Sequence, residues 1–442
     1  MSQPSSIHSR TSSTHSTHLG SSNPADREKK AEPVPAAPLA FPTTGFPELD
    51  PLGEWEEETL PMYNPKEYYP ARLGQVITHD KDQYQLIAKL GFGSSSTVWL
   101  CYNLRTNQYK ALKIHINTLP FNRELEIFAV LNGKSKQKDH PGWAHLRRLD
   151  ASFDIPGAQP GTTHSVLVFE PLGLSLRKFQ ELMPNEILDH GLVQIALYDA
   201  LRGLRYLHEV AEVTHAGTAA NLARKDFHSD NLLMEVTDQS IFHNIAKEET
   251  GTNPSARKRK NPVIYLSRAI ISGAGNVILC DFGVARKGKE HQGEAVPLPY
   301  RAPEVILGMK WGYAVDIWAS ALTAWDLVQP TSLFKLYNEK DMELNAAHHL
   351  ANMVALLGPP PKDFLKKSRA CEKYWDKEGK WHHATVKVPT ERTMESLQRV
   401  LKGNDAVLFL NFIRKVLCWL PEQRPSAADL LNVPWIQGGK LV

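Results

Sequence analysis

Oxygen-bearing side chains that could hold a metal ion occur at two places in the chain. Asp281 follows the apolar run ILC and precedes Phe-Gly, so a carboxylate stands at the end of a predicted buried strand beside a glycine turn. Asn231 ends the stretch DFHSDN and adds an amide oxygen. Such oxygens are ligands that Mg²⁺ accepts, particularly where phosphate groups complete its coordination. The sequence therefore predicts that Asn231 and Asp281 hold a magnesium ion.

A glycine-containing turn could bind phosphate. Gly91 and Gly93 lie between two strand-like runs in KLGFGSSSTVWL. Glycines let backbone amides approach a phosphate without a side chain in the way. Ser96 stands where a third glycine would complete the usual motif, so a plain glycine hairpin is an alternative interpretation of this stretch.

Lys113 lies in ALKI, on the next strand-like run. An ammonium group there can pair with phosphate oxygens if an acid holds it in place. Glu124 in the following helix is the candidate acid, and Glu126 is its competitor. A single lysine is ordinarily a solvated surface residue, but its position after a glycine turn and before an acidic amphipathic helix favours phosphate binding.

Further motifs follow Asp281 in a fixed order, namely RAPEVILG, AVDIWASALTAWDL and PEQRPSAADLLNVPW. Glu304 and Arg424 within them are natural partners for a buried ion pair, a structural tie that is costly to break. Asp316 opens a predicted helix and could accept hydrogen bonds from backbone amides of the loop that ends at Asn231.

The order and spacing of these elements resemble the eukaryotic protein kinase superfamily over roughly residues 84–436. Within it, the chain resembles the SR-protein kinases, in particular SRPK-like kinases of the fungal type. The segments that carry this narrower resemblance are YYPARLGQVI, KLGFGSSSTVWLC, VFEPLG, VIYLSR, PLPYRAPEVILG and LLGPPPKDFL. An insertion between Asn231 and Asp281 is a further mark of that family.

The resemblance implies an α+β bilobal fold that binds ATP and Mg²⁺ and phosphorylates Ser or Thr hydroxyls of proteins, including proteins rich in Arg-Ser repeats. By motif match, Asp226 would accept or orient the hydroxyl proton, while Lys113 and Glu124 would fix the α- and β-phosphates. Phe169 would be the gatekeeper before a hinge at 170–172. The other implied nucleotide contacts are Leu90, Gly91, Gly93, Val98, Ala111 and Glu170.

Four departures from the family pattern bear on activity. His228 replaces a lysine that contacts the γ-phosphate, and a histidine with an ordinary pKa of about 6.5 predicts slower transfer and a larger pH dependence. Pro297 stands where Ser/Thr kinases usually have threonine. The segment 284–299 contains no Ser, Thr or Tyr, which predicts activity without phosphorylation of this loop. The stretch 336–349, which corresponds to an acidic substrate groove, is only modestly acidic, so a surface salt-bridge cluster is an equal alternative.

His215 and Asp226 belong to a His-x-Asp motif that is split here. Either residues 217–225 are extra, or Arg224 replaces the histidine and the insertion precedes it. The insertion could be a tolerated bulge or a translated intron edge. It could also displace Asp226, since an error of about 1 Å can cost roughly 100-fold in rate. The last account makes the chain a pseudokinase or an ATP-binding interaction module, which is the alternative function. The retained lysine and metal-binding positions favour the active enzyme.

Composition and hydrophobic periodicity predict how the chain is divided. A tail rich in Ser, Thr, Pro and His cannot bury enough apolar surface to order itself. Short apolar runs then predict a small β-rich N-lobe, and helical periodicity predicts a larger α-helical C-lobe. The predicted parts are a disordered tail at 1–55, an extended lead-in at 56–83, the N-lobe at 84–170, the C-lobe at 171–436 with a family-type insert at 232–275, and a tail at 437–442. Predicted helices include 122–131, 192–208, 315–328, 345–357, 393–401, 406–418 and 426–432.

Charge and cysteine content bound the partners and the compartment. The net charge of +3 over 442 residues gives no strong attraction to nucleic acid or to membranes, and we expect neither as a partner. No apolar run approaches the roughly 18 residues of a membrane span. Four widely spaced cysteines indicate a reducing compartment, so a monomer in the cytoplasm or nucleus is expected. The RKRK run at 257–260 could be a nuclear import signal or an exposed charged loop.

Overall fold

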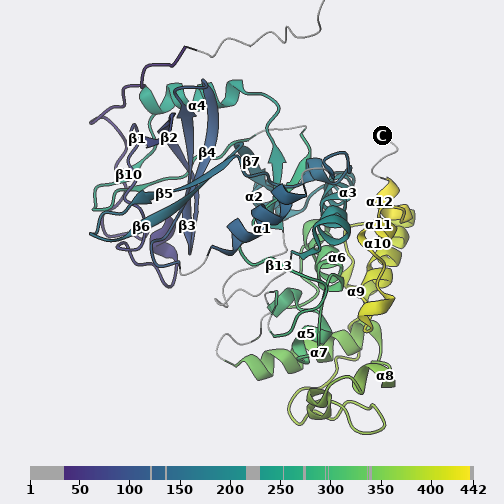
Figure 1. Ribbon diagram of the computed structural model, residues 1–442. Coiled ribbons are helices and arrows are strands. Elements are labelled where there is room, and N and C mark those ends of the chain that lie inside the picture. The colour runs from purple at the N-terminus through teal and green to yellow at the C-terminus, as the bar shows by residue number, and fades with distance from the viewer. Residues whose placement is uncertain are drawn as a thin grey trace, which may run out of the picture.

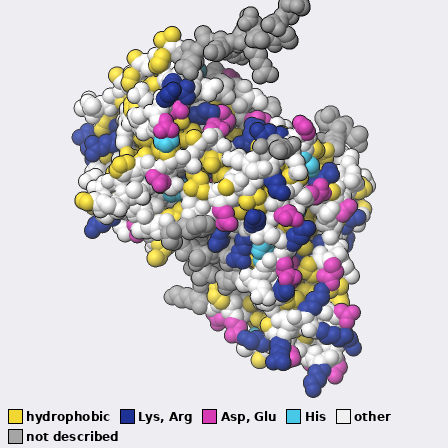
Figure 2. Space-filling view, viewed as in Figure 1, with side chains coloured by type: hydrophobic (Ala, Val, Ile, Leu, Met, Phe, Trp, Pro, Cys, Tyr) yellow, Lys and Arg dark blue, Asp and Glu magenta, His cyan; other side chains and the backbone are white. Residues whose placement is uncertain are grey.

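A β-rich lobe and a helical lobe make up the computed structural model (Figure 1), which confirms the expected α+β bilobal fold. Acidic and basic side chains are interspersed over the face shown in Figure 2, as the small net charge implies. No helix in the described ranges has the length and apolar character needed to cross a membrane. The structure describes residues 34–119, 122–134, 137–215, 229–251, 253–271, 275–293, 295–296, 298–335, 337 and 341–438.

A six-stranded antiparallel sheet forms the N-lobe, in the order β1-β2-β3-β4-β6-β5. Its short loops and alternating side chains allow neighbouring strands to pair in sequence, except that β6 lies between β4 and β5. Helix α1 (Arg123–Gly133) follows β4, and Asn122 caps its first turn by accepting a hydrogen bond from the Leu125 amide. The strands are β1 (Val76–His79), β2 (Asp82–Gly93), β3 (Ser96–Asn103), β4 (Gln108–His115), β5 (Ala151–Pro156) and β6 (Thr163–Phe169).

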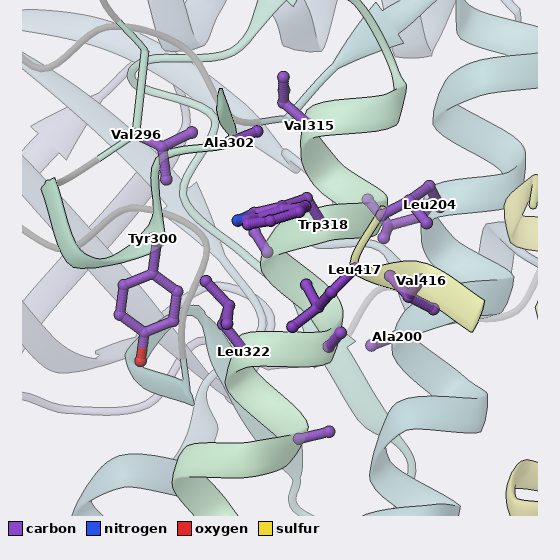
Figure 3. Packing of buried hydrophobic residues seen from close by; sticks show 14 of the residues in the cluster. Ala200, Leu204, Val296, Tyr300, Ala302, Val315, Trp318, Leu322, Val416 and Leu417 are labelled. Atoms are coloured by element: carbon purple, nitrogen blue, oxygen red, sulfur yellow. The ribbon is translucent and has the colours of Figure 1, made fainter. Parts of the chain in front are cut away.

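Helices packed around α6 form the C-lobe. Figure 3 shows Trp318 of α6 surrounded by apolar side chains from α3 and from the end of α10, and Trp318 is fully buried. The helices are α2 (Leu176–Glu181), α3 (His190–Tyr206), α5 (Pro303–Ile306), α6 (Ala314–Val328), α7 (Met342–Leu357), α8 (Lys362–Leu365), α9 (Met394–Leu397), α10 (Gly403–Val416), α11 (Ala427–Leu430) and α12 (Pro434–Gly438).

Small strands line the junction between the lobes. β7 (Leu172–Ser175), β9 (Leu232–Glu235) and β12 (Val277–Leu279) form one sheet in the order β12-β9-β7. β8 (Val213–Thr214) pairs with β13 (Arg286–Lys287). These pairings bring the segments around the predicted metal ligands side by side.

The predicted helices are present with shifted ends. Helix α7 begins at Met342 instead of 345, because the Asp341 carboxylate caps it by accepting from the Leu344 amide at 2.9 Å. Helix α9 stops at Leu397 instead of 401, because Gln398 is extended. Strand β5 was missed, although its alternating burial places Phe153 and Ile155 inward.

The insert at 232–275, predicted within the C-lobe, packs on the N-lobe. After β9 it forms α4 (Ser240–Thr250), which lies over the β-rich lobe in Figure 1. Phe242 and Ile245 of α4 join an apolar cluster with Ile87 and Leu100 of the sheet. The insert therefore links the two lobes.

The exposed charged loop, one of the two interpretations of the basic run at 257–260, holds for Arg259 and Lys260, which are exposed, but not for the two residues before them. Arg257 and Lys258 form strand β10 (Arg257–Lys258), which pairs with β11 (Ile264–Tyr265), and they are only 9% and 6% exposed. Lys258 is buried because its ammonium pairs with Glu58 at 3.0 Å. The expectation of exposure is wrong for these two residues, because Glu58 replaces water around Lys258 and the Phe46 ring lies against Arg257.

Residues 34–55, which we expected to be disordered, lie along the insert and the sheet. The Leu49 amide donates to the Arg257 carbonyl at 3.1 Å, and the Arg257 amide donates to the Pro47 carbonyl at 3.0 Å. The Arg257 guanidinium also lies 3.6 Å from the centre of the Phe46 ring. Backbone pairing with the insert supplies order that the composition of this segment does not predict.

The predicted ion pair between Glu304 and Arg424 is present and completely buried. Two hydrogen bonds of 2.6 and 2.7 Å join the guanidinium to the carboxylate, and the side chains are 1% and 0% exposed. Arg424 also donates to the Ala314 carbonyl at 3.1 Å. Arg424 thereby ties the segment before α11 to α5, through Glu304, and to the start of α6.

Replacing Glu304 with Gln leaves the buried guanidinium without its counter-charge. We expect Glu304→Gln to lower the free energy of unfolding by about 3–5 kcal/mol. Chemical denaturation monitored by fluorescence measures this. Asp363→Asn is the control, because Asp363 forms an exposed pair with Lys366 and its loss should leave the midpoint nearly unchanged. Equal, small effects of both variants would contradict the prediction.

Candidate active site

The predicted pairing of Lys113 with an acid of the following helix is present. Lys113 lies on the central strand β4, opposite Val98 of β3 and Leu167 of β6. Its ammonium is 2.6 Å from the Glu124 carboxylate on α1. Glu124 is buried, whereas Glu126 is exposed on the other side of the helix. Glu124 is therefore the partner of Lys113. Glu126 is excluded, because it lies on the exposed side of the helix.

Asp281 approaches the same lysine from the other lobe. Its carboxylate is 3.5 Å from the Lys113 ammonium. Burial opposes the charge on Lys113, but the carboxylates of Asp281 and Glu124 outweigh it and raise the pKa of Lys113 above its ordinary value. The lysine is thus held as a cation at neutral pH and above.

The backbone at Asp281 has φ of 59°, a left-handed conformation that residues other than glycine seldom adopt. Neighbouring packing holds it there. The buried Phe282 ring lies 5.4 Å from Phe128 of α1 and 5.6 Å from His215, between centroids. The Asp281 carboxylate also accepts a hydrogen bond from the Gly283 amide at 3.3 Å. The turn therefore aims the carboxylate away from the core, and its side chain is 42% exposed.

Asn231 and Asp281 are brought to the same edge of a small sheet. Leu232 of β9 pairs with Leu279 of β12, and the Cys280 amide donates to the Asn231 carbonyl at 2.8 Å. Their amide and carboxylate oxygens form a donor set suited to Mg²⁺. Among the described residues, no group of three or more His, Cys, Asp or Glu side chains could hold a metal. The two oxygens fit an ion that takes its other ligands from phosphate and water.

The glycine turn lies across one strand from Lys113. Gly91 on β2 pairs with Val98 on β3, which in turn pairs with Lys113. A Cβ built on Gly91 would meet no atom within 4 Å, so the strand is open on that side. Leu90 and Val98 are half-buried against the core, and Ala111 is buried on β4. The turn and these apolar side chains form the wall expected around a nucleotide.

The expected gatekeeper and hinge residues differ in their surroundings. Phe169 ends β6 opposite Ala111, is buried, and packs on Phe128 with ring centroids 5.5 Å apart. Glu170 points its carboxylate outward to pair with Lys110, and its side chain is 58% exposed. Any nucleotide contact at 170 would therefore come from its backbone.

His215 is buried and contacts the chain next to the predicted metal ligand Asp281. Its Nε2 lies 3.0 Å from the Cys280 carbonyl, and its amide donates to the Asp316 carboxylate at 2.9 Å. Asp316 also contacts His208 at 2.7 Å. The His215 amide thus makes the bond expected between Asp316 and the catalytic loop, while the alternative residue, Arg224, lies outside the described residues. Asp226, His228 and the insertion at 217–225 lie outside the described residues.

The segment after Asp281 is held by contacts that involve no phosphate. Besides the β8–β13 pairing, His291 and Trp311 exchange two backbone hydrogen bonds of 2.7 and 3.0 Å. The Arg286 guanidinium lies 5.1 Å from the centre of the Trp311 ring. The Arg301 side chain donates to the Val296 carbonyl at 2.9 Å. The loop is therefore ordered by its own residues over its described part.

An acidic pocket of about 400 Å³ adjoins the site and was missed from the sequence. Asp230, directly before Asn231, and Asp326, on α6, contribute carboxylates from distant parts of the chain. The Tyr300 hydroxyl donates to Asp326, and burial raises the pKa of Tyr300, so the phenol stays protonated. The other residues that line the pocket are Arg177, Gln180, Asn185, Glu186, Ser229, Gln329, Pro330 and Ser332.

Comparisons with known proteins agree with this geometry. The model of the protein kinase domain matches residues 264–436. A serine/threonine protein kinase of Aspergillus fumigatus is 38% identical over 91% of this chain and 96% of its own length. The serine/threonine-protein kinase SRPK of Physarum polycephalum is 28% identical over 87% of this chain and 92% of its own length. A solved kinase domain with a TM-score of 0.60 and 21% identity covers 84% of this chain and 100% of that chain, and it shows the same fold.

The chain belongs to the protein kinase family, as a serine/threonine kinase. Kinases of this family take ATP as the phosphoryl donor, usually with Mg²⁺, and act on proteins. Nothing in the comparisons favours the alternative of a pseudokinase.

Glu124 and Glu126 offer a matched test of the lysine pairing. Glu124→Gln removes the charge that holds Lys113, so we expect kcat/KM for phosphate transfer to fall roughly 100-fold through misplaced phosphates. Glu126→Gln changes the same group two residues along the helix and should keep the activity of the unchanged chain. Steady-state phosphorylation rates measure both, and similar losses in the two variants would contradict the assignment.

Proposed function

We propose that this kinase transfers the γ-phosphate of ATP to Ser or Thr hydroxyls in proteins that carry arginine close to the acceptor, as Arg/Ser-rich proteins do. The observation that carries the proposal is the acidic pocket next to Asn231. Among the described residues that line it, the acids Glu186, Asp230 and Asp326 stand against one arginine, Arg177, which pairs with Glu186 at 3.4 Å. The described lining therefore carries more acidic than basic side chains.

A guanidinium group matches this pocket better than an ammonium group does. Its planar fork of donors can bind two carboxylate oxygens at once, which a lysine cannot do with the same geometry. Asp230 is adjacent in sequence to the proposed metal ligand Asn231. A substrate arginine in the pocket would thus place a nearby hydroxyl toward the metal edge of the site.

The residues around the glycine turn have distinct proposed roles. Lys113, fixed by Glu124, pairs with the α- and β-phosphates of ATP, and the backbone of Gly91 and Gly93 approaches the phosphates. Asn231 and Asp281 would hold Mg²⁺, which when bound neutralises charge on the phosphate oxygens.

Leu90, Val98, Ala111 and Phe169, with the backbone at Glu170, would enclose the adenine. Their apolar side chains suit a flat base, as described for the wall beside the turn. Asp226 would orient the acceptor hydroxyl and His228 would contact the γ-phosphate.

The acids of the stretch 336–349 support the pocket over a separate substrate groove. Asp341 is committed to capping α7, and Glu343 pairs with Lys373 at 3.0 Å on the surface. Both carboxylates, which are the two of this stretch that the structure describes, thus have partners, as in the salt-bridge alternative. The pocket acids have partners as well, but Asp230 adjoins the proposed metal ligand Asn231, and this position favours the pocket for arginine recognition.

The proposed compartment is the cytoplasm or the nucleus, and the proposed state is a monomer. All four cysteines are free thiols, and three of them are buried. Such usage is typical of proteins in reducing compartments.

Asp326→Asn keeps the shape of the pocket and removes one charge. We expect it to raise KM for a serine peptide with a neighbouring arginine about tenfold or more, because hydrogen bonds to charged groups are worth about 1.5–3 kcal/mol. KM for ATP should stay unchanged, and a peptide with alanine in place of arginine should be insensitive to the substitution. Steady-state kinetics with both peptides measure this.

Glu343→Gln is the control for the groove alternative. It should leave both peptides unaffected. If Glu343→Gln raises KM for the arginine peptide while Asp326→Asn does not, substrate recognition lies at 336–349 and the pocket proposal is wrong.

A further inference from the structure

The segment before the first strand contacts both flanks of the glycine turn. We define residues 55–71 as the lead-in strap. Its first contact is made by the short 3-10 helix Glu56–Thr59. Lys89 lies on β2 just before Gly91, and its side chain is 1% exposed. The Lys89 ammonium pairs with the Glu57 carboxylate and lies 3.4 Å from that of Glu56.

A buried lysine needs such partners, because an unpaired ammonium in the interior is very costly. Glu56 and Glu57 are themselves only 10% and 8% exposed in their side chains. Water cannot take over their role without opening the strap. The pair therefore fixes the strap to β2 at the entrance to the turn.

The second contact lies on the other flank of the turn. Tyr68 is 6% exposed, and its hydroxyl donates to the Gly93 carbonyl at 2.9 Å. The adjacent Glu67 carbonyl accepts from the Asn117 amide at 3.0 Å, which ties the strap to the chain after β4. Lys89 and Gly93 thus bracket Gly91, and both are held by the same strap.

The insert holds the strap from outside. Ser267 donates to Glu56 through its amide at 2.9 Å and its hydroxyl at 2.6 Å. Lys258 pairs with Glu58 at 3.0 Å. The Arg268 amide donates to the Lys89 carbonyl at 2.7 Å. Each of the three successive acids of the strap therefore has a partner. Glu56 and Glu58 bind residues of the insert, and Glu57 binds Lys89.

We propose that Glu57 and Tyr68 are positioning residues that hold the glycine turn ready for the phosphates of ATP and so set nucleotide affinity. The inference rests on the proposed function only in that ATP binds beneath this turn. A turn fixed on both flanks loses little conformational freedom when the nucleotide binds. If one flank is released, the turn loses more conformational freedom when ATP binds, and the affinity for ATP falls.

Tyr68→Phe tests the proposal with the smallest change, the removal of one hydroxyl. We expect KM for ATP and the dissociation constant of ADP to rise about three- to tenfold, the effect of one lost hydrogen bond. The kcat and the KM for peptide should stay within twofold of the unchanged chain, a split that general loss of structure would not produce.

Tyr63→Phe is the matched control. Tyr63 belongs to the same strap and packs on Tyr68 with ring centroids 5.1 Å apart. Its hydroxyl makes no hydrogen bond within the described part of the chain, so its removal should leave ADP affinity unchanged. Glu57→Gln is a second variant at the other flank and should weaken ADP binding in the same direction.

Calorimetric titration with ADP on the full chain decides the matter without any phosphorylation assay. Unchanged ADP affinity in both Tyr68→Phe and Glu57→Gln, with thermal midpoints showing folded protein, overturns the proposal. So does an equal loss of kcat and ADP affinity in Tyr63→Phe. Neither result bears on the proposed arginine pocket. Conversely, if Asp326→Asn leaves KM for the arginine peptide unchanged, the pocket proposal is wrong and the strap proposal is unaffected.

Discussion

The ammonium of Lys113 is the group on which the arrangement of the site depends. It is reached by Glu124 from α1 at 2.6 Å and by Asp281 from the turn after β12 at 3.5 Å. A cation that is largely removed from water requires such neighbours, so β4, α1 and the turn from the other lobe must come together. The Phe282 ring between Phe128 and His215 fills the space behind them. These contacts together set the direction of the Asp281 carboxylate, which with Asn231 forms the proposed metal site.

The same arrangement is kept by a loop that carries no hydroxyl to phosphorylate. Many kinases order this segment by pairing a phosphate with arginines. Here Arg286 instead covers Trp311 and Arg301 binds the Val296 carbonyl. The backbone exchange between His291 and Trp311 closes the loop. Contacts present in the unmodified chain thus perform the task that a phosphate performs elsewhere.

Local patterns predicted the site better than they predicted its surroundings. The pairing of Lys113 with Glu124 was predictable because the strand and helix periodicity leaves few acids within reach of the lysine. The pairing of Glu304 with Arg424 was also predictable, because a buried acid needs a cation as its partner. The burial of Lys258 was not predictable, because its partner Glu58 lies 200 residues earlier in the chain. The acidic pocket likewise joins Asp230 to Asp326. Such pairings arise only from the assembled fold, and propensity carries no information about them.

The central claim is that the chain adopts its active arrangement without phosphorylation at any residue, because the contacts of the segment 284–299 hold that segment in place. The measurement is the rate of phosphate transfer to serine peptides by the full chain made in bacteria, before and after phosphatase treatment, with Asp281→Asn as the inactive reference. The account predicts equal rates in both preparations, far above that of Asp281→Asn. Loss of activity on phosphatase treatment, restored by a second kinase, would contradict it.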